Sequence, residues 1–308
     1  MRFGLCCLFV AEPVTFRTTT AKALSALSRR DALAKASAIC LHNAENLLLA
    51  VKAAQRLGIG AFRIMSPLFP RMTHPDVGYN LEDLPDAEAI ARNMADVRNF
   101  AQAHDIRLSF HPDQFVVLSS PHAHVVDSSV RELEYQALLA DMVGADVINL
   151  HAGGAYGDKA AALKRLAAVV RNLPENVASR LTLENDDVTY TVRDLLPTCA
   201  DIGLPLVYDV HHHRCNPDGL DETEATNLAA ATWKGREQYC HVSSPRDGWK
   251  NKPKPHADYI DPADFPACWL DRAMTVDVEA KAKELAVVRL MRDLGGKSAP
   301  GDEKSGTP

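Results

Sequence analysis

Two patterns of apolar residues alternate along almost the whole chain. Short apolar runs rich in β-branched residues predict buried strands, and the longer segments between them carry apolar residues at helical spacing. The strands are predicted at Arg2–Phe9, Ala61–Ser66, Ile106–His111, Asp146–His151, Arg180–Glu184, Leu206–Val210, Gln238–Val242 and Met274–Glu279. The helices are predicted at Asn43–Leu57, Asp86–Ala103, Ser128–Val143, Asp158–Asn172, Thr191–Ile202 and Ala280–Leu294. Eight rounds of this alternation predict an α/β fold, a single-domain (β/α)8 TIM barrel.

Two segments do not follow the alternation. From Glu12 to Cys40 the chain is rich in Thr, Ser and Arg, and connections of that length in compact domains tend to be functional or mobile. We predict a loop there that acts as a lid or contacts the substrate. The barrel is assigned to residues 1–296, and the polar segment 297–308 (KSAPGDEKSGTP) is predicted to be a disordered tail.

Composition narrows the class of protein. With 308 residues, 46% of them hydrophobic, the chain can bury one large core. Its formal net charge of -6 gives no overall sign of nucleic-acid binding, so such a partner would need a local basic surface or bound cations. The seven cysteines show no C-x-x-C pair, and the apolar start MRFGLCCLFV is shorter than a membrane span. We therefore expect a reducing, cytoplasmic location and no membrane association.

Polar residues with metal-binding chemistry follow the predicted strands. In a barrel, the C-terminal ends of the strands surround one opening, so these side chains should converge there. They are His111, His151, Glu184, Asp209 with His212, His241 with His256 downstream, and Glu279, while His74 follows the second strand. Any one of them alone is more often a loop residue than a ligand. Together, without metal, they would crowd like charges in a partly desolvated site.

Bound divalent cations would remove that cost. Mixed imidazole and carboxylate ligation suits manganese, zinc or iron better than calcium or magnesium, and this number of ligands could hold two or three ions. The run Asp-Val-His-His-His leaves His211 and His213 as competitors of His212. Clustered ions can activate water and neutralise a phosphoryl oxygen, which favours phosphodiester hydrolysis, but they can equally polarise a sugar for isomerisation.

A series of ordered motifs then carries a resemblance to a known family. They are FRIMSPLFPRMTHP, LSFHPDQFVVLSSP, HAGGAYGDK, LENDD, YDVHHHRCNP, HVSSP, HADY and VEAK, and they span most of the chain. This sequence resembles the ultraviolet damage endonucleases, TIM-barrel repair nucleases related to endonuclease IV. The resemblance implies incision of damaged double-stranded DNA immediately 5′ to ultraviolet photoproducts or related lesions. It also implies a cluster of two or three ions, with manganese expected and zinc or magnesium as alternatives, in a bacterial-type enzyme that is nucleoid-associated when acting.

The resemblance also assigns residues. By position, the implied metal ligands are His111, His151, Glu184, Asp209, His212, His241, His256 and Glu279. Glu184, Glu279 and His74 are the implied catalytic residues. Gln114 and Phe115 match a Gln–Tyr pair that probes the damaged duplex, and a planar aromatic beside the site could wedge into a base stack. The alternative for Phe115 is a core residue beneath its loop.

The sequence departs from the family pattern at three positions. Tyr239 stands two residues before His241, where the family usually has a lysine that becomes carboxylated and bridges metals. A phenol cannot replace that bridge, so the number or spacing of ions is expected to differ. Leu5 and Phe9 stand in the first strand where the family has a tyrosine and an asparagine, which removes polar contacts at the barrel opening.

Basic residues near the seventh strand offer a local surface for DNA. Lys250 and Lys252 lie in SSPRDGWKNKPKPH, where Trp249 is interleaved with cations, and we expect them to contact phosphates. A solvated surface turn is the equally supported alternative. We expect a monomeric repair nuclease. The competing hypotheses are a xylose-isomerase-like sugar isomerase or epimerase, which needs a closed pocket, and a non-catalytic lesion-binding relative.

Overall fold

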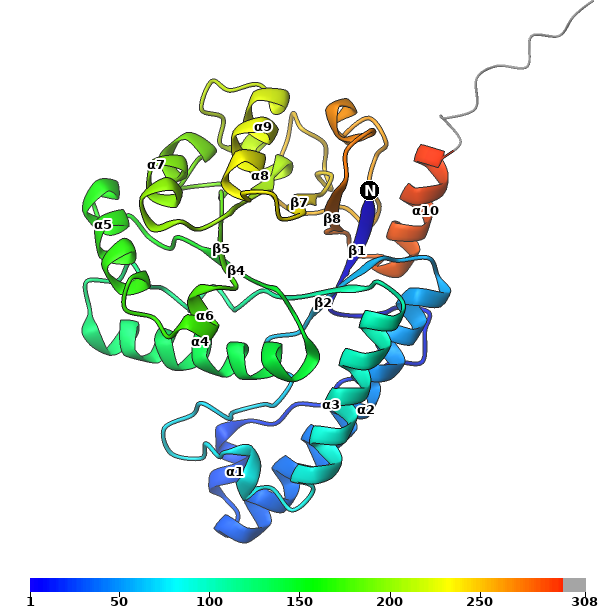
Figure 1. Ribbon diagram of the computed structural model, residues 1–308, viewed down its shortest axis with the longest axis vertical. Helices are drawn as coiled ribbons and strands as arrows, with labels where there is room; N and C mark the ends of the chain where they lie inside the picture. Colours follow the sequence, from blue (N-terminus) through cyan, green and yellow to red (C-terminus); the bar gives the residue numbers. More distant parts are fainter. Residues whose placement is uncertain (296–308) are drawn as a thin grey trace, which may run out of the picture.

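The computed structural model describes residues 1–295, and a closed barrel of parallel strands lies at its centre (Figure 1). Each strand pairs with its neighbours in sequence, and β1 pairs with β8 to close the barrel. The strands are β1 (Arg2–Cys6), β2 (Ala61–Ile64), β3 (Arg107–Phe110), β4 (Val147–His151), β5 (Leu181–Glu184), β6 (Leu206–Asp209), β7 (Gln238–Val242) and β8 (Met274–Val278). The predicted TIM barrel is therefore confirmed. The predicted tail, residues 297–308, lies outside the described residues.

Helices surround the barrel (Figure 1). They are α1 (Ala21–Ser25), α2 (Arg29–Arg56), α3 (Ala87–Ala103), α4 (Ala123–Val143), α5 (Lys159–Val170), α6 (Glu175–Ala178), α7 (Val192–Ile202), α8 (Val210–Cys215), α9 (Glu222–Thr232) and α10 (Glu284–Gly295). Two short 3₁₀ helices, η1 (Leu81–Asp83) and η2 (Ala267–Trp269), lie in the connections. Within residues 1–295, no helix combines the length and the apolar character needed to cross a membrane.

The prediction of a long loop from Glu12 to Cys40 is wrong for most of that segment. Helix α2 begins at Arg29, because the Ser28 side chain caps it by accepting a hydrogen bond from the Asp31 amide at 3.2 Å. From there it runs for 28 residues, about 42 Å at 1.5 Å per residue, beside α3 (Figure 1). The extended segment before α1 is hydrogen-bonded to α2.

The first strand is shorter than predicted. Cys7 has a φ of +65°, which ends the extended conformation one residue after β1, so Phe9 lies beyond the strand. Its ring stacks on that of Phe62 with the centroids 5.8 Å apart, and Leu5 is fully buried in the core. Both residues therefore contribute apolar packing at this side of the barrel.

The inner face of the barrel carries a buried polar layer directly below the strand ends. Successive side chains of a strand point to opposite faces, so residues two apart share the inner face. Several such pairs occur: Ser109 with His111, Asn149 with His151, Thr182 with Glu184, Tyr239 with His241, and Asp277 with Glu279. The first member of every pair is buried. Each metal-ligand candidate on these strands thus stands above a polar side chain of its own strand.

Candidate metal centre at the barrel opening

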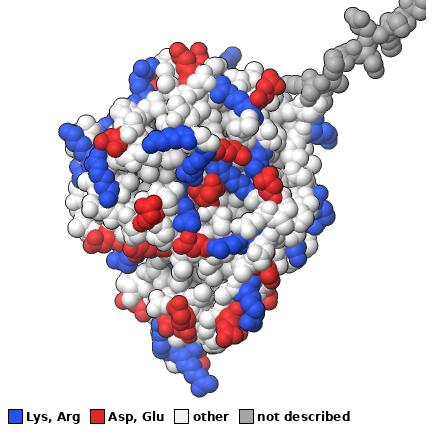
Figure 2. All heavy atoms as spheres, in the orientation of Figure 1, with Lys and Arg blue, Asp and Glu red and all other residues white. Residues whose placement is uncertain are grey.

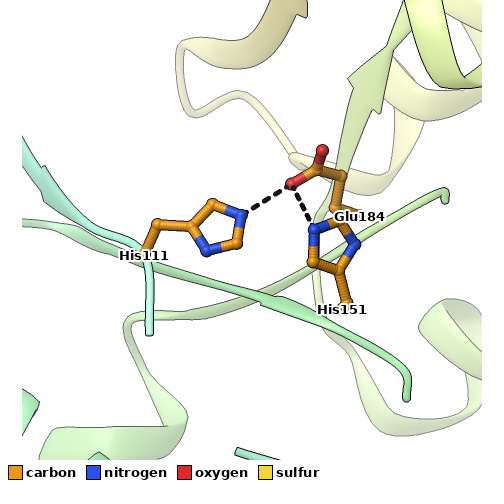
Figure 3. A group of neighbouring side chains, drawn as sticks. All are labelled: His111, His151 and Glu184. Carbon is orange, nitrogen blue, oxygen red and sulfur yellow. Dashed lines mark hydrogen bonds and ion pairs between the residues drawn. The ribbon is translucent and has the colours of Figure 1, made fainter. Parts of the chain in front are cut away.

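Glu184 lies at the centre of the polar cluster. It ends β5, and one of its oxygens, Oε2, lies 3.1 Å from His111 Nε2 and 3.9 Å from His151 Nε2. Figure 3 shows the two imidazoles directed at this carboxylate from neighbouring strands. Asn149 of β4 donates a hydrogen bond to the same oxygen and is itself held by the hydroxyl of Thr182. The carboxylate is thereby fixed in one orientation.

The other oxygen of Glu184 faces a second group of side chains. Its Oε1 lies 3.3 Å from His212 Nδ1 and 3.2 Å from His241 Nδ1. Asp209 Oδ2 lies 3.6 Å from the same His212 nitrogen and 3.9 Å from His241 Nδ1. Glu184 therefore stands between two potential ion sites, His111–His151–Glu184 and Glu184–Asp209–His212, and within each site the ligand atoms lie within 4.8 Å of one another.

Glu279 and His256 extend the cluster on the side of β8. Glu279 Oε1 lies 3.4 Å from His241 Nδ1, and Glu279 Oε2 lies 3.6 Å from His256 Nδ1. The guanidinium of Arg63, on β2, binds Glu279 Oε1 through Nη1 at 2.6 Å. All eight ligand candidates are thus brought into one connected cluster, and Arg63 joins it as a fixed cation.

Of the three consecutive histidines, His212 is the one that faces Glu184. His213 is buried with its Nδ1 2.6 Å from the Tyr208 hydroxyl and its Nε2 3.4 Å from Asp218, so both nitrogens have structural partners. His211 is buried with its ring centroid 5.2 Å from Trp249 and 5.1 Å from His256. The structure therefore favours His212 over its two neighbours.

His74 lies apart from this cluster. Its Nδ1 accepts a hydrogen bond from the Asp76 amide, and the residue lines a cavity of about 550 Å³ together with Arg71 and Phe115. The Phe115 side chain is 78% exposed, on the loop that follows β3, so the interpretation of it as a core residue is wrong. Gln114 beside it is also exposed. The pair thus projects from the loop that follows His111.

The charged groups of the cluster shift one another's pKa values. Burial alone would raise the pKa of Glu184, but the imidazoles around it, His241 foremost, hold that pKa well below its usual range. Burial would lower the pKa of His241, yet Glu184 and Glu279 raise it to about 9. For His151, burial dominates and lowers the pKa. In the metal-free cluster, Glu184 is therefore an anion and the His241 imidazole is a cation. A metal ion that binds there would displace the imidazole proton.

The donor set fits divalent cations. Imidazole nitrogens and carboxylate oxygens surround Glu184, and the buried atom Asp209 Oδ2 finds no hydrogen-bond partner within the described chain. Buried polar atoms without partners are rare in folded proteins and point to a bound ion or water. A cation between Glu184, Asp209 and His212 would satisfy the Asp209 oxygen and replace the imidazolium charge.

Basic residues lie around the opening in two places. Lys250 and Lys252 are exposed on the loop after β7, whose Trp249 is anchored by a 2.8 Å hydrogen bond from its Nε1 to Asp264 Oδ1. A second cavity, of about 280 Å³, is lined by Lys281 and Lys283 together with Arg63, His256 and Glu279. On the face drawn in Figure 2, by contrast, acidic and basic side chains are interspersed and neither sign forms an extended patch.

Comparison with known proteins identifies the family. The model of the UV-endonuclease UvdE family matches residues 1–299. The chain belongs to the UV-endonuclease family. A UV DNA damage endonuclease from Bacillus velezensis is 33% identical, with 95% of this chain and 93% of that protein aligned. The crystal structure of SacUVDE superposes with a TM-score of 0.85 at 29% identity, covering 96% of this chain and 99% of that one. Endonuclease IV from Thermus thermophilus, with a TM-score of 0.61 at 16% identity, shares the fold.

Tyr239, which stands where the resemblance to the family implies a lysine, has its hydroxyl below the cluster. That hydroxyl donates to Asp277 Oδ1 at 2.9 Å and lies 2.9 Å from Ser109 Oγ. Burial raises the pKa of Tyr239 well above its usual range. The phenol is thus a neutral member of the polar layer.

Sequence reasoning missed the supporting roles of Asn149 and Asp277 and the contact of Arg63 with Glu279. A signal was present for two of them: in VINLH and TVDVE a polar residue interrupts an apolar run two positions before a ligand candidate. Period-two alternation places such a residue on the same strand face as the ligand. Arg63 has no comparable signal, because its partner Glu279 is distant in sequence and only the closed barrel brings them together.

Proposed function

We propose that this chain is a DNA repair endonuclease that hydrolyses the phosphodiester immediately 5′ to ultraviolet photoproducts or related lesions. Membership of the UV-endonuclease family supports an endonuclease reaction. The observation that carries the proposal is the placement of Glu184 between two groups of ligands, with each of the other candidates within 3.9 Å of at least one other member of the cluster. Such a site suits two or three clustered divalent ions, with manganese expected and zinc or magnesium as alternatives.

When bound, clustered ions would lower the pKa of a water molecule and neutralise charge on the phosphate and its leaving oxygen. The residues of this chain would supply the rest. Asn149 holds Glu184 in the orientation that presents one oxygen to each group. Arg63 neutralises the Glu279 carboxylate. Lys281 and Lys283 line the adjacent cavity and would provide positive charge for a DNA backbone phosphate.

Recognition of damage is proposed to depend on Gln114 and Phe115. An aromatic ring that is 78% exposed gains little from the core, but it can insert between bases and partly unstack them. A lesion weakens stacking and pairing, so insertion costs less at a damaged step than in intact duplex. Lys250 and Lys252 are proposed to neutralise phosphates of the same duplex and so to hold it over the opening. The sugar-isomerase alternative is less supported, because the matching family and the relative from Bacillus velezensis are endonucleases.

The test is incision of an end-labelled duplex that contains one pyrimidine dimer, with added manganese. We expect a single metal-dependent cut immediately 5′ to the dimer, no cut in the undamaged duplex, and no cut with EDTA. A protein shown to be loaded with manganese that leaves the dimer duplex intact, or cuts both duplexes equally, would refute the proposal. We further propose that a single subunit acts, so that the rate per enzyme molecule stays constant on dilution.

A further inference from the structure

Two buried polar atoms below the metal centre face each other without a hydrogen bond. His241 Nε2 and Asp277 Oδ2 lie 4.0 Å apart, in side chains that are almost completely buried. Neither atom has a hydrogen-bond partner in the part of the chain that the structure describes. Leaving both unpaired inside the barrel is costly, so the pair calls for a functional explanation.

The fold holds Asp277 in place from several sides. Its Oδ1 accepts a hydrogen bond from the Tyr239 hydroxyl at 2.9 Å. Gly4 of the neighbouring strand β1 leaves room for the carboxylate, because a Cβ at that position would lie 2.0 Å from Asp277 Oδ1. Arg63 Nε lies 3.8 Å from Asp277 Oδ2 and offsets part of the cost of a buried anion. The oxygen without a hydrogen bond, Oδ2, therefore lies between Arg63 Nε at 3.8 Å and His241 Nε2 at 4.0 Å.

One ring nitrogen of His241 lies in the cluster of ligand candidates, and the other faces the polar layer below it. Its Nδ1 lies 3.2 Å from Glu184 Oε1 and 3.4 Å from Glu279 Oε1, inside the cluster of ligand candidates. Its Nε2 is directed down to Asp277. A metal-ligating histidine commonly donates its other ring N–H to a carboxylate, which fixes the tautomer and the orientation of the ring. The two nitrogens of His241 are placed for this division of roles.

We propose that Asp277 is a positioning residue for His241. It accepts a hydrogen bond from His241 Nε2–H when Nδ1 binds an ion, and Tyr239 serves as the anchor of Asp277 and not as a metal ligand. A shift of the ring by about 1 Å would close the 4.0 Å gap to a normal hydrogen-bond length. This inference rests on the metal site of the proposed function and adds the residues that set the geometry of one of its ligands.

The competing explanation is that Asp277 only neutralises Arg63 and stabilises the barrel. The variant D277N removes both the charge beside Arg63 and the acceptor for His241, so it tests whether metal affinity depends on Asp277, and the protonation of His241 Nε2 separates the two explanations. The amide of D277N keeps the shape of the side chain, but if its oxygen stays with Tyr239, its NH₂ group faces His241 Nε2 and cannot accept a hydrogen bond. The matched control is S109A, which removes the hydroxyl on the other side of Tyr239 and leaves the contact between Tyr239 and Asp277 in place.

The first measurement is manganese binding by the metal-free full-length protein, followed by electron paramagnetic resonance and without DNA. We expect D277N to bind the tightest ions about 10- to 100-fold more weakly than the wild type, Y239F to be weakened less, and S109A to be unaffected. Equal affinities in D277N and the wild type, or equal losses in D277N and S109A, would overturn the assignment.

A second measurement uses the wild-type protein, so it does not depend on whether a variant of Asp277 folds. In the zinc-loaded wild-type protein, ¹⁵N spectra of the histidine rings should show His241 with Nδ1 bound to the ion and Nε2 protonated, the signal being assigned by its loss in H241Q. An ion on Nε2, or a deprotonated Nε2, would overturn the proposal. Because neither measurement uses DNA, a protein that binds metal as described but does not incise damaged duplex would refute the proposed function alone.

Discussion

The variant E184Q tests the central arrangement of the cluster in the metal-free protein. Glutamine keeps nearly the size of the side chain but removes the anion that faces four imidazoles. With the anion gone, the protonated form of the neighbouring histidines loses its principal partner. The fold should therefore lose a stabilising contribution that depends on pH, in addition to losing its ability to hold metal.

The size of this contribution follows from His241. Although burial opposes it, Glu184 and Glu279 raise the pKa of His241 from 6.5 to about 9, which corresponds to about 3 kcal/mol of stability. A raised folded-state pKa means that this stabilisation is fully present below pH 6.5 and is lost as the pH rises through about 9. Glu184 is the largest of the raising influences, so E184Q should remove much of it at about pH 6 and almost none at about pH 10.

The assay is denaturant unfolding with a chelator present, at both pH values, for the wild type and for E184Q. We expect the difference in unfolding free energy between the two proteins to be larger at the lower pH by up to about 3 kcal/mol. The matched control is E88Q, on a side chain that is 94% exposed and pairs only with Arg92 among described residues, and it should show no such dependence. A difference between E184Q and the wild type that does not change with pH would refute the coupling of Glu184 to His241.

Three further predictions concern other parts of the site. R63M should destabilise the protein by up to about 3 kcal/mol in urea unfolding, since it leaves the partly buried Glu279 carboxylate without its 2.6 Å partner; a loss below about 1 kcal/mol would contradict the pairing. F115A should leave stability within about 0.5 kcal/mol but reduce incision of a dimer-containing duplex, whereas F115Y should retain it; equal incision by F115A would remove Phe115 from lesion recognition. The double variant K250A/K252A should reduce the slope of log affinity against log salt by about 2 in a DNA titration, and an unchanged slope would show that these lysines do not contact phosphate.

The barrel and its cluster could be predicted from the sequence because both depend on local patterns. Apolar runs identify the strands, and a polar residue at the end of a run must lie at the C-terminal opening once the strands are parallel. The start of α2 was missed for a local reason as well. Its first turns contain small and charged residues, so helical periodicity is weak there, but the Ser28–Asp31 spacing is a helix-start signal that the composition of the segment concealed.

The polar layer below the cluster was less accessible. Spacing along one strand puts a polar residue such as Asn149 or Asp277 on the face of the ligand candidate two positions later, but it does not show which side chain of another strand that residue contacts. The role of Tyr239 depends on even more distant contacts, because its hydroxyl meets Ser109 of β3 and Asp277 of β8. Such assignments require the closed barrel and cannot be read from spacing along one strand.

The position of Arg63 bears on how many ions the centre can hold. Glu184 and Asp209 face imidazoles and no described lysine or arginine, so bound metal ions would replace the imidazolium charge that compensates them in the metal-free protein. Glu279 is different, because Arg63 already contacts it at 2.6 Å from β2 of the barrel wall, with its side chain only 13% exposed. An ion between Glu279 and His256 would meet a carboxylate that is already neutralised, and it would lie close to a fixed guanidinium. We therefore expect the ions around Glu184 to bind most tightly, with any third ion near Glu279 the weakest of the set.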